Sequence, residues 1–339
     1  MNGALIGLGM VADTHVAASE ASQKVRLCGV LGRDPAKSKA FAARHQIAKV
    51  YDNLTAVLRD PECDFIVLAT PPDARLDYVS ACVAAGKPIL MEKPIERSFE
   101  AARQIVNICQ EASVPLGIVF QHRARAASQA LKTALEENRL GQICSADIRI
   151  PWWRDQSYYD APGRGTYARD GGGVLLTQAI HTLDLALWFL GPVARVQAML
   201  RTTPLHQLEA EDWAGGLLEF ASGAVATLMA TTAAYPGAGE TVTLHGTKGS
   251  AHLEAGILTL HFQDGTHDHI GAEASTGSGA DPMAFPFGWH QTILETFAAS
   301  LQSDTPSLAT GMDALRCHAL IDALEAANRS GQITKVQQI

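Results

Sequence analysis

Three short stretches of the sequence carry residue types that can do chemistry. Gly7–Ala12 follows an apolar run, Glu92–Pro94 ends another, and Gly171–Gly173 opens a segment that contains His181 and Asp184. Hydride transfer from a carbinol carbon requires an oriented cofactor, removal of the hydroxyl proton and stabilisation of the developing negative charge. We expect the three stretches to supply, in this order, a cofactor site, a fixed cation and a proton carrier.

The first stretch has the spacing of a dinucleotide-binding turn between a strand and a helix. Gly7 allows a tight turn, Gly9 lets a pyrophosphate approach the backbone, and the small Ala12 lets strand and helix pack closely. The N-terminus of the helix then offers free N–H groups to the phosphates. Gly163–Ala168 has the same spacing, but no strand precedes it, so we do not assign it to a cofactor.

The end of the second predicted strand bears on the choice of cofactor. Gly32 makes room there, and the guanidinium of Arg33 suits the 2′-phosphate of NADP. Asp34 supports either NAD, by binding the ribose, or a purely structural role as the cap of a helix that begins with Pro35. We therefore expect NADP, with NAD as the alternative. The expected cofactor contacts are Gly7, Leu8, Gly9, Met10, Val11, Gly32, Arg33, Asp34, Ala69, Thr70, Pro71, Glu92, Lys93 and Gln121.

The second and third stretches supply the expected catalytic residues Lys93, His181 and Asp184. The imidazole of His181 suits proton transfer near neutral pH, and Lys93 places a positive charge beside the reacting oxygen. Thr177, His181 and Asp184 share one stripe of a regular helix, so Asp184 can hold the imidazole and Thr177 can bind a substrate hydroxyl. The alternatives are a core histidine beside Trp188 and an aspartate that serves packing.

A loop rich in aromatic and polar residues, Trp152–Tyr159, has the groups that sugars require. Aromatic faces stack on sugar rings, and arginines bind hydroxyls or a carboxylate. Arg154, Tyr158 and Arg164 are therefore candidate substrate contacts, together with Lys93, Thr177 and His181. Two arginines hint at an acidic sugar, whereas the alternative is a loop at an interface between protein chains.

The order of the apolar runs predicts two domains. Strand and helix patterns alternate up to Phe120, which is typical of a doubly wound parallel sheet. We place a dinucleotide-binding α/β domain at 1–121 and an α+β substrate-binding and oligomerisation domain at 122–339. Strand-like runs separated by turns predict a largely antiparallel sheet in the second domain. The helices expected to cover one face of that sheet are Gly173–Leu190, Gly288–Ser300 and Gly311–Ser330.

Composition excludes several classes of partner and site. The 339 residues carry a formal net charge of −8, which argues against nucleic acid and anionic membranes as partners. Six cysteines without paired spacing suggest reduced thiols and a cytoplasmic protein. The apolar start lacks the basic residues and cleavage site of a signal peptide, and no transmembrane run is expected. We expect no metal site, because the spacing of the group His261, Asp264, His267, Asp268 and His269 is irregular.

With these motifs together, the chain resembles the Gfo/Idh/MocA family of oxidoreductases. The resemblance rests on Gly7–Ala12 with His15, on Thr70-Pro71, on Glu92–Pro94, and on Gly171–Gly173 followed by His181-x-x-Asp184. It implies a Rossmann domain, an open-faced sheet domain, a nicotinamide cofactor and the oxidation of a secondary alcohol on a sugar or cyclitol. It also implies homodimers or homotetramers that pack through the sheet.

The sequence departs from the family pattern at a few positions. Pro72 and Arg75 stand where many members have Asn and His, and Thr177 stands where many have Asp or Asn. The hypothesis is an NAD(P)-dependent oxidoreductase that acts on a secondary alcohol or ketone of a sugar, sugar acid or cyclitol. Two alternatives stay open: a glycoside hydrolase that oxidises its sugar transiently with NAD, and a catalytically silent sugar-sensing protein.

Overall fold

A parallel sheet of six strands forms the centre of the first of two units in the computed structural model, which describes residues 1–272, 274–303 and 305–339. Its strands lie side by side in the order β3-β2-β1-β4-β5-β6. They are β1 (Asn2–Ile6), β2 (Arg26–Leu31), β3 (Lys49–Val50), β4 (Phe65–Leu68), β5 (Ile89–Met91) and β6 (Leu116–Ile118). From β1 the chain adds β2 and β3 on one side, and it then adds β4, β5 and β6 on the other side of β1. Ligands bind at the carboxyl ends of the strands at such a switch point.

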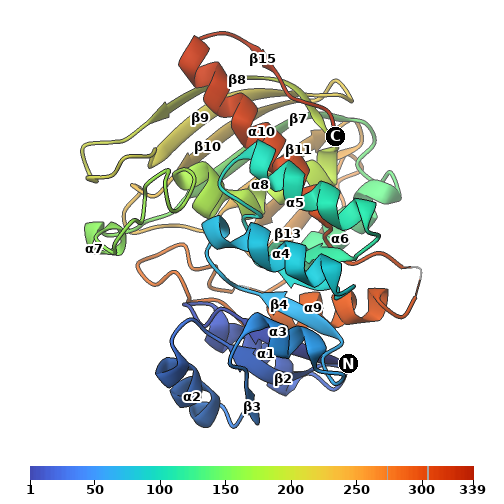
Figure 1. Cartoon of the computed structure of the whole chain (residues 1–339). Helices are drawn as coiled ribbons and strands as arrows, with labels where there is room; N and C mark the ends of the chain where they lie inside the picture. Colours follow the sequence, from blue (N-terminus) through green and yellow to red (C-terminus); the bar gives the residue numbers. More distant parts are fainter. Residues whose placement is uncertain (273, 304) are drawn as a thin grey trace. The chain divides into compact units, whose positions relative to one another are not determined.

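Helices connect these strands, as the alternating pattern predicts. They are α1 (Ala12–Ala21), α2 (Pro35–Arg44), α3 (Leu54–Arg59), α4 (Arg75–Ala84) and α5 (Phe99–Glu111), with a 3-10 turn, η1 (Pro72–Ala74), before α4. All four residues of β4 are buried, which explains its continuous apolar run. The doubly wound parallel sheet is confirmed, and the short helix α3 is the one connection that the sequence pattern did not reveal (Figure 1).

One predicted helix belongs to a different unit from the one expected. α9 (Gly288–Ser300) was expected on the antiparallel sheet, but residues Phe287–Ala314 belong to the first unit, together with Met1–Glu96 and Glu100–Gln121. Phe297 of α9 packs edge-on against Phe65 with ring centroids 5.5 Å apart. Because its apolar stripe fits either sheet, only the packed structure decides where α9 lies.

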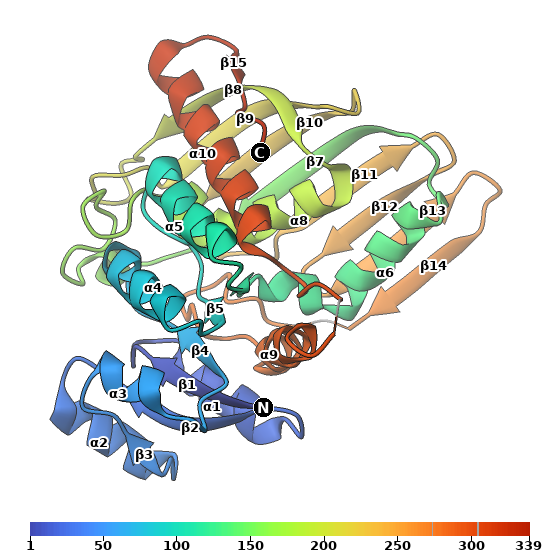
Figure 2. The same cartoon turned by 45° about the vertical axis from the view of Figure 1, so that its right-hand side comes forward.

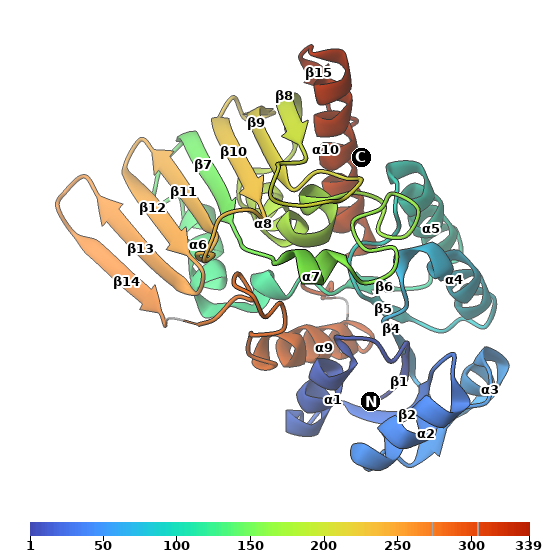
Figure 3. The same ribbon diagram turned by 90° about the vertical axis from the view of Figure 1, so that its left-hand side faces the viewer.

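A mixed sheet of nine strands forms the second unit. The order is β14-β13-β12-β11-β7-β10-β9-β8-β15, and all neighbours are antiparallel except β7 and β10 (Figure 3). The strands are β7 (Ile143–Pro151), β8 (Val193–Arg201), β9 (Trp213–Phe220), β10 (Val225–Thr231), β11 (Thr241–Gly246), β12 (Gly249–Glu254), β13 (Ile257–Phe262), β14 (His267–Gly271) and β15 (Thr334–Lys335). The largely antiparallel sheet is confirmed; β14 and β15 add to the predicted strands.

Helices cover one face of this second sheet (Figure 2). They are α6 (Ala126–Glu136), α8 (Ile180–Leu190) and α10 (Gly311–Ser330), while the short α7 (Gln156–Tyr159) lies in the loop after β7. Side chains alternate between buried and accessible along β10 and β13, which is the pattern of a sheet with one covered face. The opposite face of the sheet carries no helix in the described part of the unit.

The second unit contains residues Arg97–Phe99, His122–Pro286 and Leu315–Ile339. The observed units therefore differ from a simple division after residue 121, because the chain returns to the first unit at Phe287. The assignment of cofactor binding to one unit and substrate binding to the other stays a prediction. None of the described helices has both the length and the apolar character that a membrane crossing requires.

Candidate active site

The turn between β1 and α1 brings the backbone close to the end of β4. Gly7 has φ +98°, and a Cβ there would lie 2.6 Å from the carbonyl carbon of Ala69 and 2.7 Å from the nitrogen of Thr70. Only glycine fits that approach without strain. A Cβ at Gly9, in contrast, would meet no atom of the described residues within 4 Å. Gly9 is therefore not required by packing within the chain and leaves open space beside the turn.

The residues around this turn fit the pyrophosphate of a dinucleotide. Val11, at the start of α1, makes no side-chain cap, and the first-turn N–H groups of Ala12 and Thr14 donate to the carbonyl oxygens of Gly9 and Val11, so the described residues leave the N–H group of Asp13 for a ligand. The buried hydroxyl of Thr70 likewise has no hydrogen-bond partner among the described residues. A bound dinucleotide would supply acceptors for these donors.

At the end of β2, Asp34 serves as a helix cap. Its carboxylate accepts hydrogen bonds from the backbone nitrogens of Ala36 at 2.9 Å and Lys37 at 3.2 Å. Arg33 is exposed beside it. A Cβ at Gly32 would lie 2.6 Å from the hydroxyl oxygen of Ser38, so close packing requires this glycine. The geometry matches the capping alternative for Asp34.

Lys93 follows β5 at the carboxyl edge of the parallel sheet and is half-buried. The preceding carboxylate, Glu92, is buried and accepts a hydrogen bond of 2.8 Å from Nε2 of His15 on α1. Nε2 of His290, on α9, lies 3.7 Å from the same oxygen. Three elements of the first unit therefore converge on the residue directly before Lys93.

His15, Glu92 and His290 are the one group of the described residues that has three metal-ligand atoms within 4.8 Å of one another. Two ligands of a tetrahedral zinc ion are separated by about 3.4 Å when the bonds are near 2.1 Å. The 2.8 Å between His15 and Glu92 is shorter and is an ordinary hydrogen-bond distance. We therefore interpret the group as a hydrogen-bonded cluster.

In the second unit, the three consecutive glycines form a crowded turn before a helix. A Cβ at Gly171, which has φ +82°, would lie 2.4 Å from the Cα of Arg97, and one at Gly173 would lie 1.8 Å from the carbonyl oxygen of Glu211. The carboxylate of Glu211 also accepts hydrogen bonds of 3.1 Å from the nitrogens of Gly173 and Leu175. Glu211 therefore caps the start of the helical segment that leads to His181.

That segment is not a regular α-helix throughout, which corrects the expected stripe of three residues. Leu175–Ala179 forms a π-helical turn, and α8 begins only at Ile180. Regular spacing holds for His181 and Asp184 but not for Thr177, because a π-turn inserts an extra residue. The hydroxyl of Thr177 bonds within its own segment, to the carbonyl oxygen of Gly173 at 2.6 Å.

His181 is buried on α8, and its ring stacks on that of His122 with centroids 4.8 Å apart and an angle of 28° between the planes. Arg123, the next residue, forms a buried two-pronged ion pair with Asp184, with distances of 2.7 and 2.6 Å. Asp184 thus binds the segment that carries His122, the neighbour of the histidine ring.

The predicted substrate residues of the aromatic loop lie together. Arg154 and Arg164 place their guanidinium groups over the ring of Tyr158, at 5.5 and 4.2 Å from its centroid. Gln178, from the π-turn, donates to the hydroxyl of Tyr158 at 3.3 Å. Arg154 is fully buried and donates to the carbonyl oxygens of Trp153, Gly277 and Gly279 at 2.5–2.6 Å. Arg164 is half-buried.

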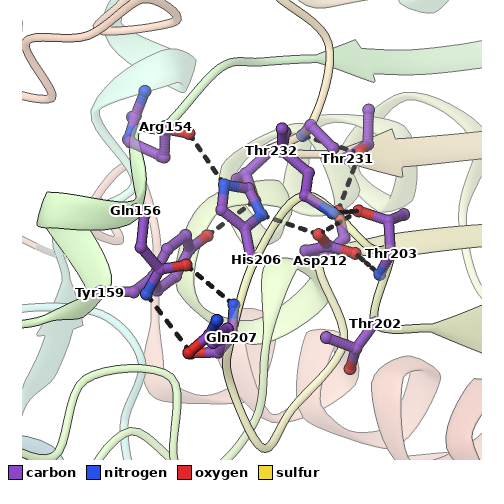
Figure 4. A network of polar contacts seen from close by, with 12 residues as sticks. Arg154, Gln156, Tyr159, Thr202, Thr203, His206, Gln207, Asp212, Thr231 and Thr232 are labelled. Carbon is purple, nitrogen blue, oxygen red and sulfur yellow. Dashed lines mark hydrogen bonds and ion pairs between the residues drawn. The ribbon is translucent and has the colours of Figure 1, made fainter.

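A network of polar contacts connects this loop to residues near β9 and β10 (Figure 4). His206 contacts the carbonyl oxygen of Arg154 through Nε2 at 2.9 Å and Asp212 through Nδ1 at 2.7 Å. Tyr159 and Thr232 share a hydrogen bond of 2.6 Å between their hydroxyls. These contacts hold the loop against β9 and β10.

Comparison with known proteins now identifies the family. Residues 1–120 match the family described as "Oxidoreductase family, NAD-binding Rossmann fold", and residues 128–252 match the "GFO/IDH/MocA C-terminal domain". Together the matches cover more than two thirds of the chain. The chain belongs to the GFO/IDH/MocA family.

Relatives of this GFO/IDH/MocA protein extend over nearly its whole length. A D-apiose dehydrogenase of Rhizobium rhizogenes is 26% identical, covering 99% of this chain and 97% of the relative. An inositol 2-dehydrogenase of Rhizobium meliloti is 26% identical, covering 94% of each. The WlbA dehydrogenase of Bordetella pertussis, solved with NADH and UDP-GlcNAcA, is 27% identical with a TM-score of 0.84, covering 100% of this chain and 99% of that one.

The GFO/IDH/MocA protein is therefore an oxidoreductase that transfers a hydride and uses a nicotinamide cofactor. Of the expected site residues, the first unit contains those of the glycine turn and strand ends, with Lys93 and the buried Gln121. The second unit brings Tyr158 and Arg164 together and places His181 on α8.

Sequence reasoning missed several supporting residues in this family member. His290, Gln178 and Glu211 contact site residues from positions that no local motif marks. Arg123, the hydrogen-bond partner of Asp184, could be recognised in the sequence only as an arginine near the boundary between the two predicted domains. Of the five residues from His261 to His269, His261 lies on β13, Asp264 lies in the following turn, and the other three lie on β14; the rings of His261 and His267 are 6.4 Å apart.

Proposed function

We propose that the protein oxidises a secondary hydroxyl, or reduces the matching ketone, of a sugar, sugar acid or cyclitol. The observation that carries this proposal is Lys93, a half-buried lysine after β5, on the same carboxyl edge of the parallel sheet as the turn after β1 that suits a dinucleotide. The names of two relatives, a D-apiose dehydrogenase and an inositol 2-dehydrogenase, support the same substrate class here.

In this proposal, Lys93 and His181 have different roles in the reaction. The ammonium of Lys93 stabilises the developing negative charge, and the imidazole of His181 accepts the hydroxyl proton. In the reducing direction the same groups protonate the carbonyl oxygen. The nicotinamide, when bound, accepts or donates the hydride. The stacked ring of His122 supports this role, because it holds the His181 imidazole in one orientation.

Asp184 and Thr177 receive supporting roles. Asp184, expected among the catalytic residues, stabilises Arg123 and the segment beside it, since both of its oxygens accept from that guanidinium. Thr177, expected to bind substrate, stabilises the π-turn through its bond to Gly173.

Tyr158 and Arg164 are the proposed substrate contacts of the aromatic loop. Arg154 is already bound to three carbonyl oxygens, which fits a role in holding the loop. Arg164 stacks on Tyr158 and remains half-buried, so its guanidinium suits a carboxylate or vicinal hydroxyls of a sugar acid.

NADP is the proposed cofactor, with NAD as the alternative. Asp34 is engaged as a helix cap, and an exposed arginine stands where NAD enzymes place an acidic residue for the ribose. Arg33 is then the anchor of the 2′-phosphate.

A second copy of the chain is the proposed occupant of the uncovered sheet face. Large apolar side chains are exposed there: Met199 (52%), Leu217 (58%), Val225 (53%) and Ile333 (62%). Arg195 and Glu219 pair beside them, so a two-fold contact can combine an apolar centre with charged groups. A homodimer or homotetramer through this sheet follows.

The test is a substrate screen at 340 nm with NADP⁺ and NAD⁺ against sugars, sugar acids and cyclitols. With the best substrate, Lys93→Met and His181→Ala should each lower kcat by about 10²-fold or more. Lys87→Met is the matched control, because Lys87 lies at the opposite end of β5 and binds the carbonyl oxygen of Cys63. Wild-type kcat in both site variants would contradict the proposal.

Two other outcomes would redirect the assignment. Copurified NAD with turnover of glycosides in the absence of added cofactor would identify a hydrolase that oxidises its substrate transiently. Ligand binding with no change at 340 nm for either cofactor would identify a sensing protein.

A further inference from the structure

The short segment that carries Lys93 is held by a buried arginine that the family pattern does not predict. Arg75, on α4, is 2% exposed and donates from Nε and Nη2 to the carbonyl oxygen of Thr70, at 3.0 and 2.8 Å. Its Nη1 donates to the carbonyl oxygens of Glu92 and Pro94. The two residues that flank Lys93 are thus bound by one guanidinium, which also binds the loop after β4.

The side chain before Lys93 is held from the opposite direction. Glu92 is buried, accepts from His15 at 2.8 Å and has His290 at 3.7 Å. Both histidines are 2% exposed. His15 of α1 and His290 of α9 therefore contact the side chain of Glu92, whereas Arg75 of α4 binds its main-chain carbonyl oxygen.

The charges of this group favour an ionised carboxylate beside the lysine. Burial opposes ionisation of Glu92, but the hydrogen bond from His15 and the contact with His290 outweigh it and hold the pKa of Glu92 well below its usual range. Burial lowers the pKa of His290, and the nearby charge of Lys93 contributes in the same direction.

The guanidinium on the other side stays charged as well. Burial lowers the pKa of Arg75 to about 10, and the charges of Glu92, Glu96 and Asp73 oppose that fall. The titratable groups in and around this cluster are thus His15 from α1, His290 from α9, Arg75 from α4, Asp73 from η1, and Lys93 and Glu96 from the segment of Glu92 itself.

We propose that Arg75 and the His15–Glu92–His290 cluster are positioning residues that fix the main chain on both sides of Lys93 and keep its amine in the charged form. The inference rests on the proposed role of Lys93 at the reacting oxygen. Arg75 acts through geometry, since two of its bonds end on the carbonyls that flank Lys93. Glu92 acts through charge as well, because an anion nearby favours the ammonium over the amine.

Two variants separate geometry from charge, and both are measured by two independent readouts. The first readout is kcat and KM with the substrate found at 340 nm. The second uses the cofactor-free protein: brief acetylation with acetic anhydride over a pH series, with mass spectrometry of the peptide that contains Lys93. Only the neutral amine is acetylated, so the labelling midpoint reports the ionisation of Lys93.

Glu92→Gln should lower kcat by about tenfold or more with KM within about twofold, and should move the labelling midpoint of Lys93 to lower pH. Arg75→Lys keeps a positive charge but loses the fork that reaches several carbonyls, so it should lower kcat without moving the midpoint. Asp60→Asn is the matched control, because it removes a carboxylate that binds Lys49 and Tyr51 elsewhere in the first unit.

The proposal is overturned if Glu92→Gln and Arg75→Lys fold and retain both wild-type kcat and the wild-type labelling midpoint. If Glu92→Gln does not fold, His290→Gln tests the positioning alone, since it removes the longer of the two contacts and keeps the carboxylate; it should lower kcat without moving the labelling midpoint, and wild-type kcat in this variant overturns the role of the cluster. Lys93→Met distinguishes the two levels of failure. Activity retained in that variant refutes the role of Lys93 itself, whereas activity lost there but retained in the other variants refutes only the positioning.

Discussion

Asp184 and Arg123 form a buried two-pronged ion pair with nitrogen–oxygen distances of 2.6 and 2.7 Å. The pair joins α8 to the 3-10 turn η2 (Gln121–Ala124). Since His122 lies in that turn and stacks on His181, the pair also supports the stacking. Asp184 thus acts on His181 indirectly. It binds Arg123, and the adjacent residue, His122, stacks on the ring of His181.

Breaking this pair should destabilise the protein strongly. Asp184→Asn leaves the guanidinium of Arg123 buried without its counter-charge, which we expect to cost about 3–5 kcal/mol in the free energy of unfolding. Urea denaturation measures the loss. Arg44→Ala, at the exposed Arg44–Asp13 pair, is the control and should change stability by less than about 1 kcal/mol. Equal losses in the two variants would contradict the structural role of Asp184.

Stability should also depend on pH through Glu211. Burial raises the pKa of this carboxyl to about 7, with the charge of Glu325 adding to the rise and the backbone bonds from Leu175 and Gly173 opposing it. An unfolded glutamate titrates near about 4.3, so between these values the unfolded chain loses a proton that the folded chain keeps. The stabilising contribution present below about pH 4.3 is therefore lost as the pH rises through about 7.

Glu211→Gln should remove that dependence. The difference in unfolding free energy between the variant and the wild type should shift in favour of the variant by on the order of 3 kcal/mol between pH 4.5 and pH 7.5. Urea titrations at several pH values measure it. Parallel curves for the two proteins over this range would show that Glu211 does not titrate there.

The two glycines of the cofactor turn should respond differently to the same substitution. Gly7→Ala forces a Cβ into the backbone at Ala69 and requires φ +98°, so we expect a loss of more than about 1 kcal/mol of stability. The methyl group of Gly9→Ala meets no atom within 4 Å in the part of the chain that the structure describes, so stability should stay within about 0.5 kcal/mol of the wild type. This methyl group enters the proposed pyrophosphate space, so cofactor affinity should fall by about tenfold or more. Calorimetry and NADPH fluorescence measure the two effects.

Arg33 should decide the preference for NADP. Arg33→Ala should reduce the rise in melting temperature caused by NADP⁺ and leave the rise caused by NAD⁺ unchanged, because only NADP carries the 2′-phosphate. Lys37→Ala is the control, since Lys37 is a nearby exposed cation on α2. If the wild-type protein prefers NAD⁺, NADP is not the cofactor, and Asp34 becomes the expected ribose-binding residue.

The oligomeric state should depend on the uncovered face of the nine-stranded sheet. Leu217→Lys places a charge in the exposed apolar area, so light scattering on a sizing column should show a smaller assembly than for the wild type. Leu205→Lys, at a similarly exposed leucine in a loop, should leave the mass unchanged. A wild-type mass for Leu217→Lys would move the interface elsewhere.

Local patterns in the sequence predicted most elements of the fold and the turn at Gly7, but not α3, β14, β15 or the π-helical turn at Leu175–Ala179. The tight approach at Gly7, the buried run of β4 and the alternating burial of the later strands are properties of neighbouring residues. Backbone conformation and burial both limit which residue types occur at neighbouring positions. These features can therefore be predicted from the local sequence pattern, without coordinates. The motif that places Lys93 after β5 is of the same kind.

Only the tertiary structure decided which distant residues meet. The placement of α9 in the first unit, the approach of His290 to Glu92 and the grip of Arg75 on the segment of Lys93 depend on packing between elements far apart in sequence. An amphipathic helix shows which of its faces is buried but not what that face packs against, and a charged residue does not reveal its partner. The sequence by itself therefore determined which chemical groups are available, and the packed structure decided how those groups are held.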